Sequence, residues 1–221
     1  MNGALEQQSA NVAEALVARV ATVGCEADPY LGSLGQEGSP NLGLDLADAV
    51  HMLCSLHGHY PGLIAIAETR SEDAFVRSWL AVAGEAFERE RALLLRLTAA
   101  VGPIPSTPGA AESESSLAAA RHALETLAHS ERSGCAVGAA CALVADWQPI
   151  RRMLNRAAWR SGIDTSVPDL PDTASLQEII TYVAAVPAAA RALGFGSEQL
   201  LLQHRAVFSL LEARSESRRD F

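Results

Sequence analysis

The sequence predicts an all-α protein, a single domain over residues 1–221 that folds as a helical bundle of six to seven helices. Of the 221 residues, 49% are hydrophobic, which is enough for a substantial core. Most of these are Ala, Leu and Val, and only 5% of residues are aromatic, a composition that favours close-packed helices over sheets. Apolar residues also recur at three- and four-residue intervals. Four long helices should form the core, with two shorter C-terminal ones packed on it.

The charge balance argues against several classes of partner. A formal charge of -9 and a pI near 5.1 disfavour binding to nucleic acid or to an anionic membrane, since both require clustered positive charge. The apolar run Ser133 to Ala145 is shorter than the roughly 20 residues of a membrane-spanning helix. No basic and then apolar segment opens the chain, so we expect a cytoplasmic protein. All 17 basic residues are Arg, which fits the codon usage of a GC-rich bacterial genome.

The first helix is expected over residues 3–23, where apolar residues recur at helical spacing. Residues 24–43 contain two prolines and five glycines and have little periodicity. This segment is predicted to be an irregular loop and the most mobile part of the chain apart from the termini, because it offers few apolar anchors.

The second helix should run from Leu44 to Glu68, with Pro61 kinking or splitting it, because proline lacks the backbone donor. A third is expected after Ser71, a plausible N-cap, and should continue to Val101. Residues 102–112 are rich in Pro and Ser and predict a linker.

The fourth helix is predicted from Ser113 to Asp146, with Pro149 starting or kinking a continuation through Trp159. A capping box at Ser175 should open a further helix that Pro187 disturbs and Gly194 ends. The dipeptide Gly196-Ser197 should then open the last helix.

Gly134 and Gly138 form a GxxxG spacing that allows another helix backbone to approach closely. Our leading functional hypothesis is therefore a non-enzymatic bundle that acts through self-association, as a homodimer, or through a protein partner bound at this small-residue face. The four cysteines, Cys25, Cys54, Cys135 and Cys141, contain no CxxC pair and are expected to be reduced structural thiols.

Four ionisable residues fall on helical faces where apolar residues are expected. Glu90 and Glu131 lie in the middle of the apolar stripes of the third and fourth helices, His204 in the middle of the last, and His57 at the edge of the second. A lone buried carboxylate costs several kcal/mol, so both glutamates should be paired, protonated or metal-bound. The alternative function is therefore a metal- or small-ligand-binding bundle that uses these four residues, with Fe, Mn or Zn as the metal.

At a rise of about 1.5 Å per residue, His57 and Glu131 are both expected about 17 Å along the bundle from the turn between the second and third helices. They should therefore lie at the same level. As a buried ion pair, they would hold the pKa of His57 above about 6.5. Other polar groups fall on the opposite faces and are expected to be solvated: His51, His122, His129, Glu125 and Asp48. A solvated face is also expected for Arg151, Arg152, Arg156 and Arg160, although such a group can bind a phosphate or an acidic partner.

Long helices with inward carboxylates resemble the ferritin-like bundle proteins over about residues 3–146. That family holds two metal ions with one Glu from each of two helices and a Glu-x-x-His from each of the other two. The nearest counterparts are Asp48-Ala49-Val50-His51, with Asp for Glu, and Glu125-Thr126-Leu127-Ala128-His129, with one residue too many. The resemblance therefore implies the bundle architecture and assigns no metal ligand.

Overall fold

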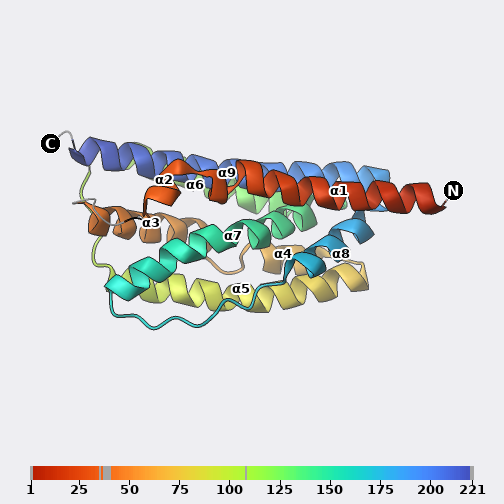
Figure 1. Cartoon of the computed structure of the whole chain (residues 1–221), viewed down its shortest axis with the longest axis horizontal. Coiled ribbons are helices and arrows are strands. Elements are labelled where there is room, and N and C mark those ends of the chain that lie inside the picture. Colours follow the sequence, from red (N-terminus) through yellow and green to blue (C-terminus); the bar gives the residue numbers. More distant parts are fainter. Residues whose placement is uncertain (1, 35, 37–40, 108, 220–221) are drawn as a thin grey trace.

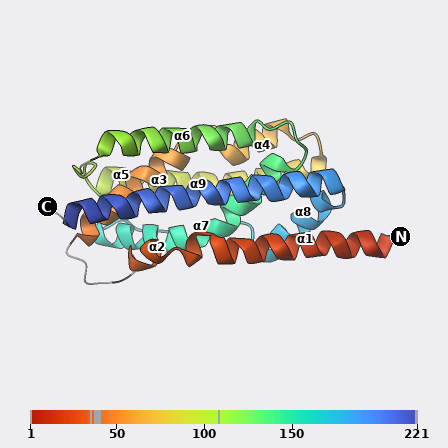
Figure 2. The ribbon, with the colours of Figure 1, turned by 90° about the horizontal axis from the view of Figure 1, so that it is seen from above.

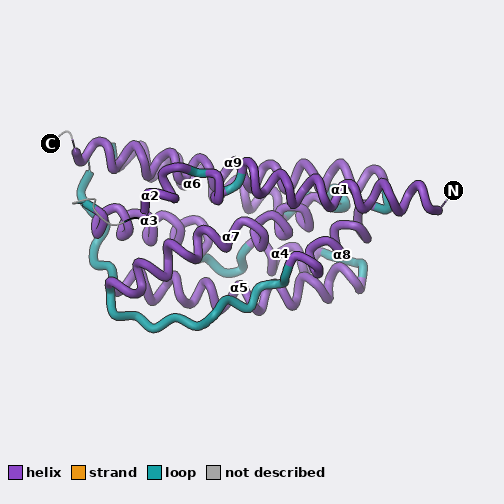
Figure 3. Tube along the Cα trace, in the orientation of Figure 1, coloured by secondary structure: helices purple, strands orange, loops and turns teal. Residues whose placement is uncertain are grey.

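The computed structural model describes residues 2–34, 36, 41–107 and 109–219, and within them every regular element is a helix. The predicted all-α class is confirmed. The helices form an elongated bundle, with the start of the first helix and the end of the last at opposite ends of the molecule (Figures 1 and 3). No helix among the described residues is both long and apolar enough to cross a membrane.

The N-terminal region is more ordered than the sequence indicates. After α1 (Asn2–Val23), the chain forms a short 3₁₀ helix, η1 (Cys25–Ala27), and then α2 (Pro29–Leu34). Proline suits the first position of a helix because its missing donor would be unpaired there. Three of the six residues of α2 are buried, namely Tyr30, Leu31 and Leu34. The prediction of an irregular loop is therefore wrong for residues 25–34, while residues 35 and 37–40 lie outside the described part.

The next three helices follow the prediction with small changes. Pro61 lies in the break between α3 (Leu42–His57) and α4 (Leu63–Arg70), so it splits the predicted second helix. The long helix α5 (Ala74–Ala100) is capped by Asp73, whose carboxylate accepts bonds from the Phe75 and Val76 amides, rather than by Ser71.

The predicted fourth helix is two helices. After α6 (Ala110–Ala128) the chain leaves the helical path and re-enters it at α7 (Cys135–Arg160). Gly134 has a φ of 94°, a left-handed conformation that favours glycine and that starts α7 in a new direction. Pro149 lies inside α7 without ending it.

At the C-terminal end, α8 (Thr173–Ala184) is capped by Asp172, which accepts a bond from the Ser175 amide. The last helix, α9 (Pro187–Arg219), continues through Gly194 for 33 residues, so the predicted stop and restart there are wrong. Pro187 occupies its first position. A lone glycine costs a helix only about 1 kcal/mol, which packing along the whole bundle readily offsets.

Close packing of α7 on α9 uses the small residues. A Cβ atom added to Gly138 would lie 2.0 Å from the carbonyl oxygen of Leu193, and one added to Gly196 would lie 2.0 Å from that of Cys135. A Cβ on Gly134 would meet the carbonyl oxygen of Ala189 at 2.5 Å. The close helix contact is therefore confirmed, but it is made within the chain, so the small-residue face is not available as the predicted partner surface.

Helix α9 lies between α6 and α1 when the bundle is seen from above (Figure 2). The segment joining α7 to α8 runs back along α5 (Figure 1). It is held there by Arg89, which pairs with Asp169 at 2.8 Å, and by Arg96, which donates to the Asp164 carbonyl at 3.3 Å. Two arginines of α5 therefore hold the α7–α8 segment against that helix.

Candidate functional site

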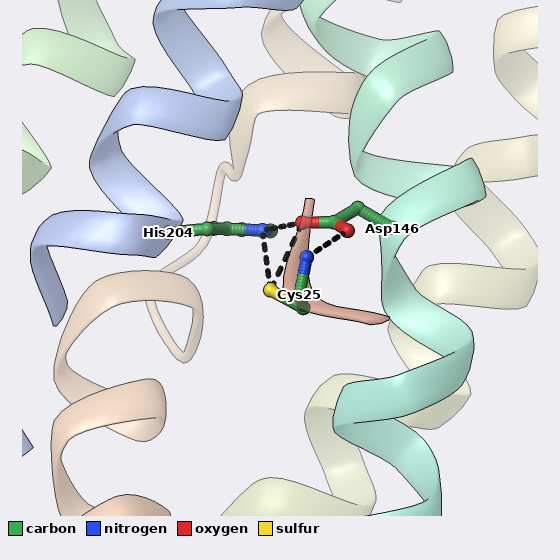
Figure 4. A group of neighbouring side chains, drawn as sticks. All are labelled: Cys25, Asp146 and His204. Carbon is green, nitrogen blue, oxygen red and sulfur yellow. Dashed lines mark hydrogen bonds and ion pairs between the residues drawn. The ribbon is translucent and has the colours of Figure 1, made fainter. Parts of the chain in front are cut away.

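Three side chains from distant parts of the sequence meet in the core. Cys25 comes from η1, Asp146 from the middle of α7 and His204 from α9, and their side chains converge (Figure 4). The Cys25 Sγ lies 3.0 Å from Asp146 Oδ2, and His204 Nδ1 lies 2.7 Å from the same oxygen and 3.7 Å from the sulfur. All three residues are at most 2% exposed. We refer to Cys25, Asp146 and His204 as the triad cluster.

The backbone just before Cys25 fixes the carboxylate. A Cβ on Gly24 would lie only 2.3 Å from Asp146 Oδ1, so a glycine lets the chain pass this closely. The Cys25 amide then donates to Oδ1 at 2.7 Å. One carboxylate oxygen is thereby held by the backbone, while the other faces the thiol and the imidazole.

His57 extends the cluster on the far side of His204. The two Nε2 atoms are 3.0 Å apart, so one ring donates to the other. The His57 ring also stands edge-on to Phe87 and Trp147, with centroids 6.0 Å and 5.5 Å away. An unbroken chain of hydrogen bonds therefore runs from His57 through His204 and Asp146 to Cys25.

Burial decides the protonation of the outer members. Desolvation, followed by the charge of Asp146, raises the pKa of the Cys25 thiol well above its usual value. Desolvation, followed by repulsion from His204, lowers the pKa of His57 well below 6.5. At neutral pH Cys25 is a thiol and His57 is neutral, so the cluster lacks the thiolate of a cysteine nucleophile.

Glu131 is not part of this site. It is exposed and lies in the segment between α6 and α7, because the predicted continuous helix is broken there. No ion pair joins it to His57 among the described contacts, and the pKa of His57 moves in the direction opposite to the one that such a pair predicts. The predicted His57–Glu131 pair is therefore wrong.

Glu90 is buried, as predicted, and has structural partners. Its carboxylate accepts bonds from Arg151 Nη1 at 2.9 Å and from Trp147 Nε1 at 2.9 Å. Arg151 also donates to the Ser166 carbonyl at 2.6 Å. At 2% exposed, Arg151 contradicts the expected solvated face. Arg152 and Arg160 are exposed as expected, and Arg156 is half-buried.

A second buried network joins α3 to the end of α9. Arg214 forms a two-pronged ion pair with Asp48, with contacts of 2.9 and 3.1 Å, and Arg218 pairs with both Asp48 and Asp45. Asp48 is 1% exposed, so its predicted solvation is wrong. Asp48 lies on the face of α3 opposite its apolar stripe, and that face packs against α9.

Of the other polar residues predicted to be solvated, three are exposed and one is half-buried. Glu125, His122 and His129 are exposed, as predicted. His51 is half-buried, and one ring nitrogen lies 2.8 Å from the Gly102 carbonyl oxygen. All four cysteines are free, and Cys25, Cys135 and Cys141 are buried.

Sequence reasoning found His57 and His204 and missed Cys25 and Asp146. Cys25 lies in the segment predicted to be an irregular loop, and Asp146 is the last residue of the predicted fourth helix. One signal is present: Asp146 directly follows the apolar run that ends at Ala145 and directly precedes Trp147, so it lies between apolar residues inside α7. A carboxylate at such a position requires a buried partner.

Comparison with known proteins gives one result. Residues 20–219 match a family of unknown function, DUF6975. No curated protein and no solved structure matches the chain. The matched range contains the triad cluster and His57.

Proposed function

We propose that this chain, which belongs to the DUF6975 family of unknown function, binds a single divalent transition-metal ion through Cys25, Asp146 and His204. The observation that carries the proposal is the convergence of three ligand atoms of different kinds, within 4.8 Å of one another, from three separate elements. Sulfur, imidazole nitrogen and carboxylate oxygen are the ligand types that proteins use for such ions.

The distances suit a tetrahedral centre after a small adjustment. Metal bonds of about 2.0 Å to N or O and 2.3 Å to S place ligand atoms roughly 3.3 to 3.6 Å apart. The contacts of Asp146 with His204 and Cys25 are 2.7 and 3.0 Å, so they would open by on the order of half an ångström. The ion would take the place of the protons that these atoms now share.

Neighbouring groups match the supporting role seen around metal ligands. With Nδ1 on the metal, His204 keeps its proton on Nε2 and donates it to His57, which desolvation holds neutral and able to accept. The Cys25 amide holds the second oxygen of Asp146 in place. These partners fix the orientation of two of the three ligands.

The ligand set favours zinc among the metals considered. A thiolate is a soft ligand and disfavours manganese, while zinc and ferrous iron accept mixed S, N and O ligands. Three protein ligands leave one tetrahedral position open, as in zinc sites that bind a water or a small molecule. The competing interpretation is a metal-free polar cluster that only stabilises the core.

Metal content and spectroscopy distinguish these interpretations. Protein purified without chelator or added metal should contain close to one zinc or iron per chain by elemental analysis. Cobalt(II) added to metal-free protein should give an intense thiolate-to-metal band in the near ultraviolet and tetrahedral bands in the visible. It should also release the Cys25 proton and raise the melting temperature.

Matched variants assign the ligands. Cys25→Ser should abolish the thiolate band, and Asp146→Asn and His204→Gln should weaken metal binding at least tenfold, the lower end of the effect of losing even a supporting group. Cys54→Ser, which alters a thiol outside the cluster, should leave the spectrum unchanged. Stable wild-type protein that takes up no zinc, iron or cobalt would contradict the proposal and leave a structural cluster.

A further inference from the structure

One surface pocket reaches the triad cluster. It has a volume of about 300 Å³ and lies between the η1–α2 segment and α7, which lie side by side (Figure 2). Among the described residues that line it, Cys25 is the one member of the cluster. This volume is at the lower end for small-ligand pockets, which span roughly 300 to 1,000 Å³. A small molecule in the pocket would therefore lie beside a proposed metal ligand.

The wall of this pocket is largely apolar. Leu31 of α2 and Pro149 and Met153 of α7 line it, and all three are buried. Gly32, the next residue of α2, is exposed and also lines the pocket. A Cβ atom added to Gly32 would meet no atom within 4 Å, so the space beside it is open.

The charged groups of the lining already have partners. Arg152 pairs with Glu26, and about 60% of each of these side chains is exposed to solvent. Arg156 has an interaction of its own as well. A ligand therefore meets no free charge on this lining, and the apolar wall is the surface that the pocket offers.

The charge of the proposed metal centre favours a neutral ligand. A divalent ion bound by the Cys25 thiolate and the Asp146 carboxylate carries no net charge, and His204 binds as a neutral imidazole. These ligands are at most 2% exposed, so an anion in the fourth position would place an unpaired negative charge in the core, which is costly. A heteroaromatic ring nitrogen is a neutral donor and suits both zinc and iron.

We infer that this pocket binds a small neutral heteroaromatic molecule, whose ring nitrogen takes the fourth position on the metal and whose apolar face lies against Leu31, Pro149 and Met153. The inference rests on the proposed metal site. It goes beyond that site by naming the class of ligand and the route by which the ligand enters, past Gly32.

Pyridine and the cobalt-loaded protein test the coordination. At mildly alkaline pH pyridine is neutral, and it should shift the visible bands because a nitrogen donor enters the coordination shell. A pyridine with methyl groups on both sides of its nitrogen cannot reach the metal and should leave the bands unchanged. Benzoate, an anion of similar size, should bind at least about tenfold more weakly than pyridine, because it brings a charge into the core.

An apolar extension of the probe tests the wall. An ethyl group on the ring carbon opposite the nitrogen should tighten binding by up to about tenfold, because it buries more apolar surface. Equal affinities for the two pyridines would show that the ligand does not contact Leu31, Pro149 and Met153, and would contradict that part of the inference.

Gly32 tests the route. Gly32→Leu fills open space in the lining, so the cobalt spectrum without pyridine should be unchanged while pyridine binds about tenfold more weakly. Gly194→Leu is the matched control, because Gly194 is also an exposed helical glycine whose added Cβ would meet nothing within 4 Å, and it does not line this pocket. It should leave pyridine binding unchanged.

The outcomes separate this inference from the proposed function. Cobalt-loaded protein whose bands ignore pyridine, or that binds benzoate as tightly as pyridine, would overturn the inferred ligand and leave the metal site intact. Pyridine binding that is equally strong in Gly32→Leu and Gly194→Leu would overturn the assigned pocket. Failure of cobalt to bind at all would instead remove the proposed function, and this inference with it.

Discussion

At the scale of single residues, burial shifts the pKa of His57 in the direction opposite to the one that the sequence predicts. The residue is 6% exposed and contacts His204 and the rings of Phe87 and Trp147 rather than a carboxylate. An imidazolium there would lose hydration and would face a second imidazole. The charged form is therefore disfavoured, and the pKa of His57 is lowered in the folded state.

The lowered pKa of His57 should make the folded protein less stable at acidic pH. Below about pH 6.5, His57 is protonated in the unfolded chain but stays neutral in the folded protein. The free energy of unfolding should therefore fall as the pH drops below that value. Each unit of pKa difference contributes about 1.36 kcal/mol. Urea unfolding of wild type and His57→Gln at pH 7.5 and 5.5 measures the effect, which should be smaller in the variant. An NMR titration of His57 with a pKa above 6.5 would contradict the prediction.

At the scale of the helices, the contact between α7 and α9 depends on particular glycines. Gly194 and Gly196 lie two residues apart on α9, but a Cβ at Gly194 meets nothing within 4 Å, whereas one at Gly196 meets the carbonyl oxygen of Cys135 at 2.0 Å. Both residues are helical, so the intrinsic preference for Ala over Gly is the same at the two positions.

The two Gly→Ala substitutions should therefore have opposite effects. Gly194→Ala should stabilise the protein by about 0.4–1 kcal/mol, since it restricts the unfolded chain. Gly196→Ala should destabilise it by about 1–3 kcal/mol or more, since α9 must move away from α7. Chemical denaturation of both variants measures the difference. Equal effects at the two positions would show that α7 and α9 are not in close contact.

At the scale of the whole molecule, the long helix α9 connects regions that are far apart in the sequence. α9 runs the length of the bundle and contacts α1, α3, α6, α7 and α8. Its far end is tied to α3 by the buried pairs of Arg214 and Arg218 with Asp48. Removing any one helix would expose core residues of several others, which favours unfolding in a single step.

We therefore predict one cooperative transition. Far-ultraviolet circular dichroism reports the helices, and tryptophan fluorescence reports mainly the fully buried Trp147 and the largely buried Trp79. The two signals should change at the same urea concentration in metal-free protein. Midpoints that differ beyond error would indicate two independently folding parts and would contradict the single-domain interpretation.

The sequence by itself determined the helical class, an interruption at Pro61 as either a kink or a break, the burial of Glu90, His57 and His204, and the close approach at Gly138. These properties depend on local conformational preferences and on the 3.6-residue helical period, and both can be recognised within a single segment of the sequence. The sequence does not predict the helix start at Gly134, and it predicts a helix end at Gly194 that α9 does not have. Tertiary packing can offset the local cost of a glycine, as at Gly194, or use its left-handed conformation, as at Gly134.

Only the tertiary structure decided which buried groups meet. Cys25, Asp146 and His204 are separated by 121 and 58 residues, and no local pattern encodes their contact. Glu90 pairs with Arg151, and Asp48 pairs with Arg214. The partner of each buried charge is the residue that lies beside it where two helices pack together. A helical wheel finds a residue that needs a partner, whereas the partner depends on how the helices are arranged in space.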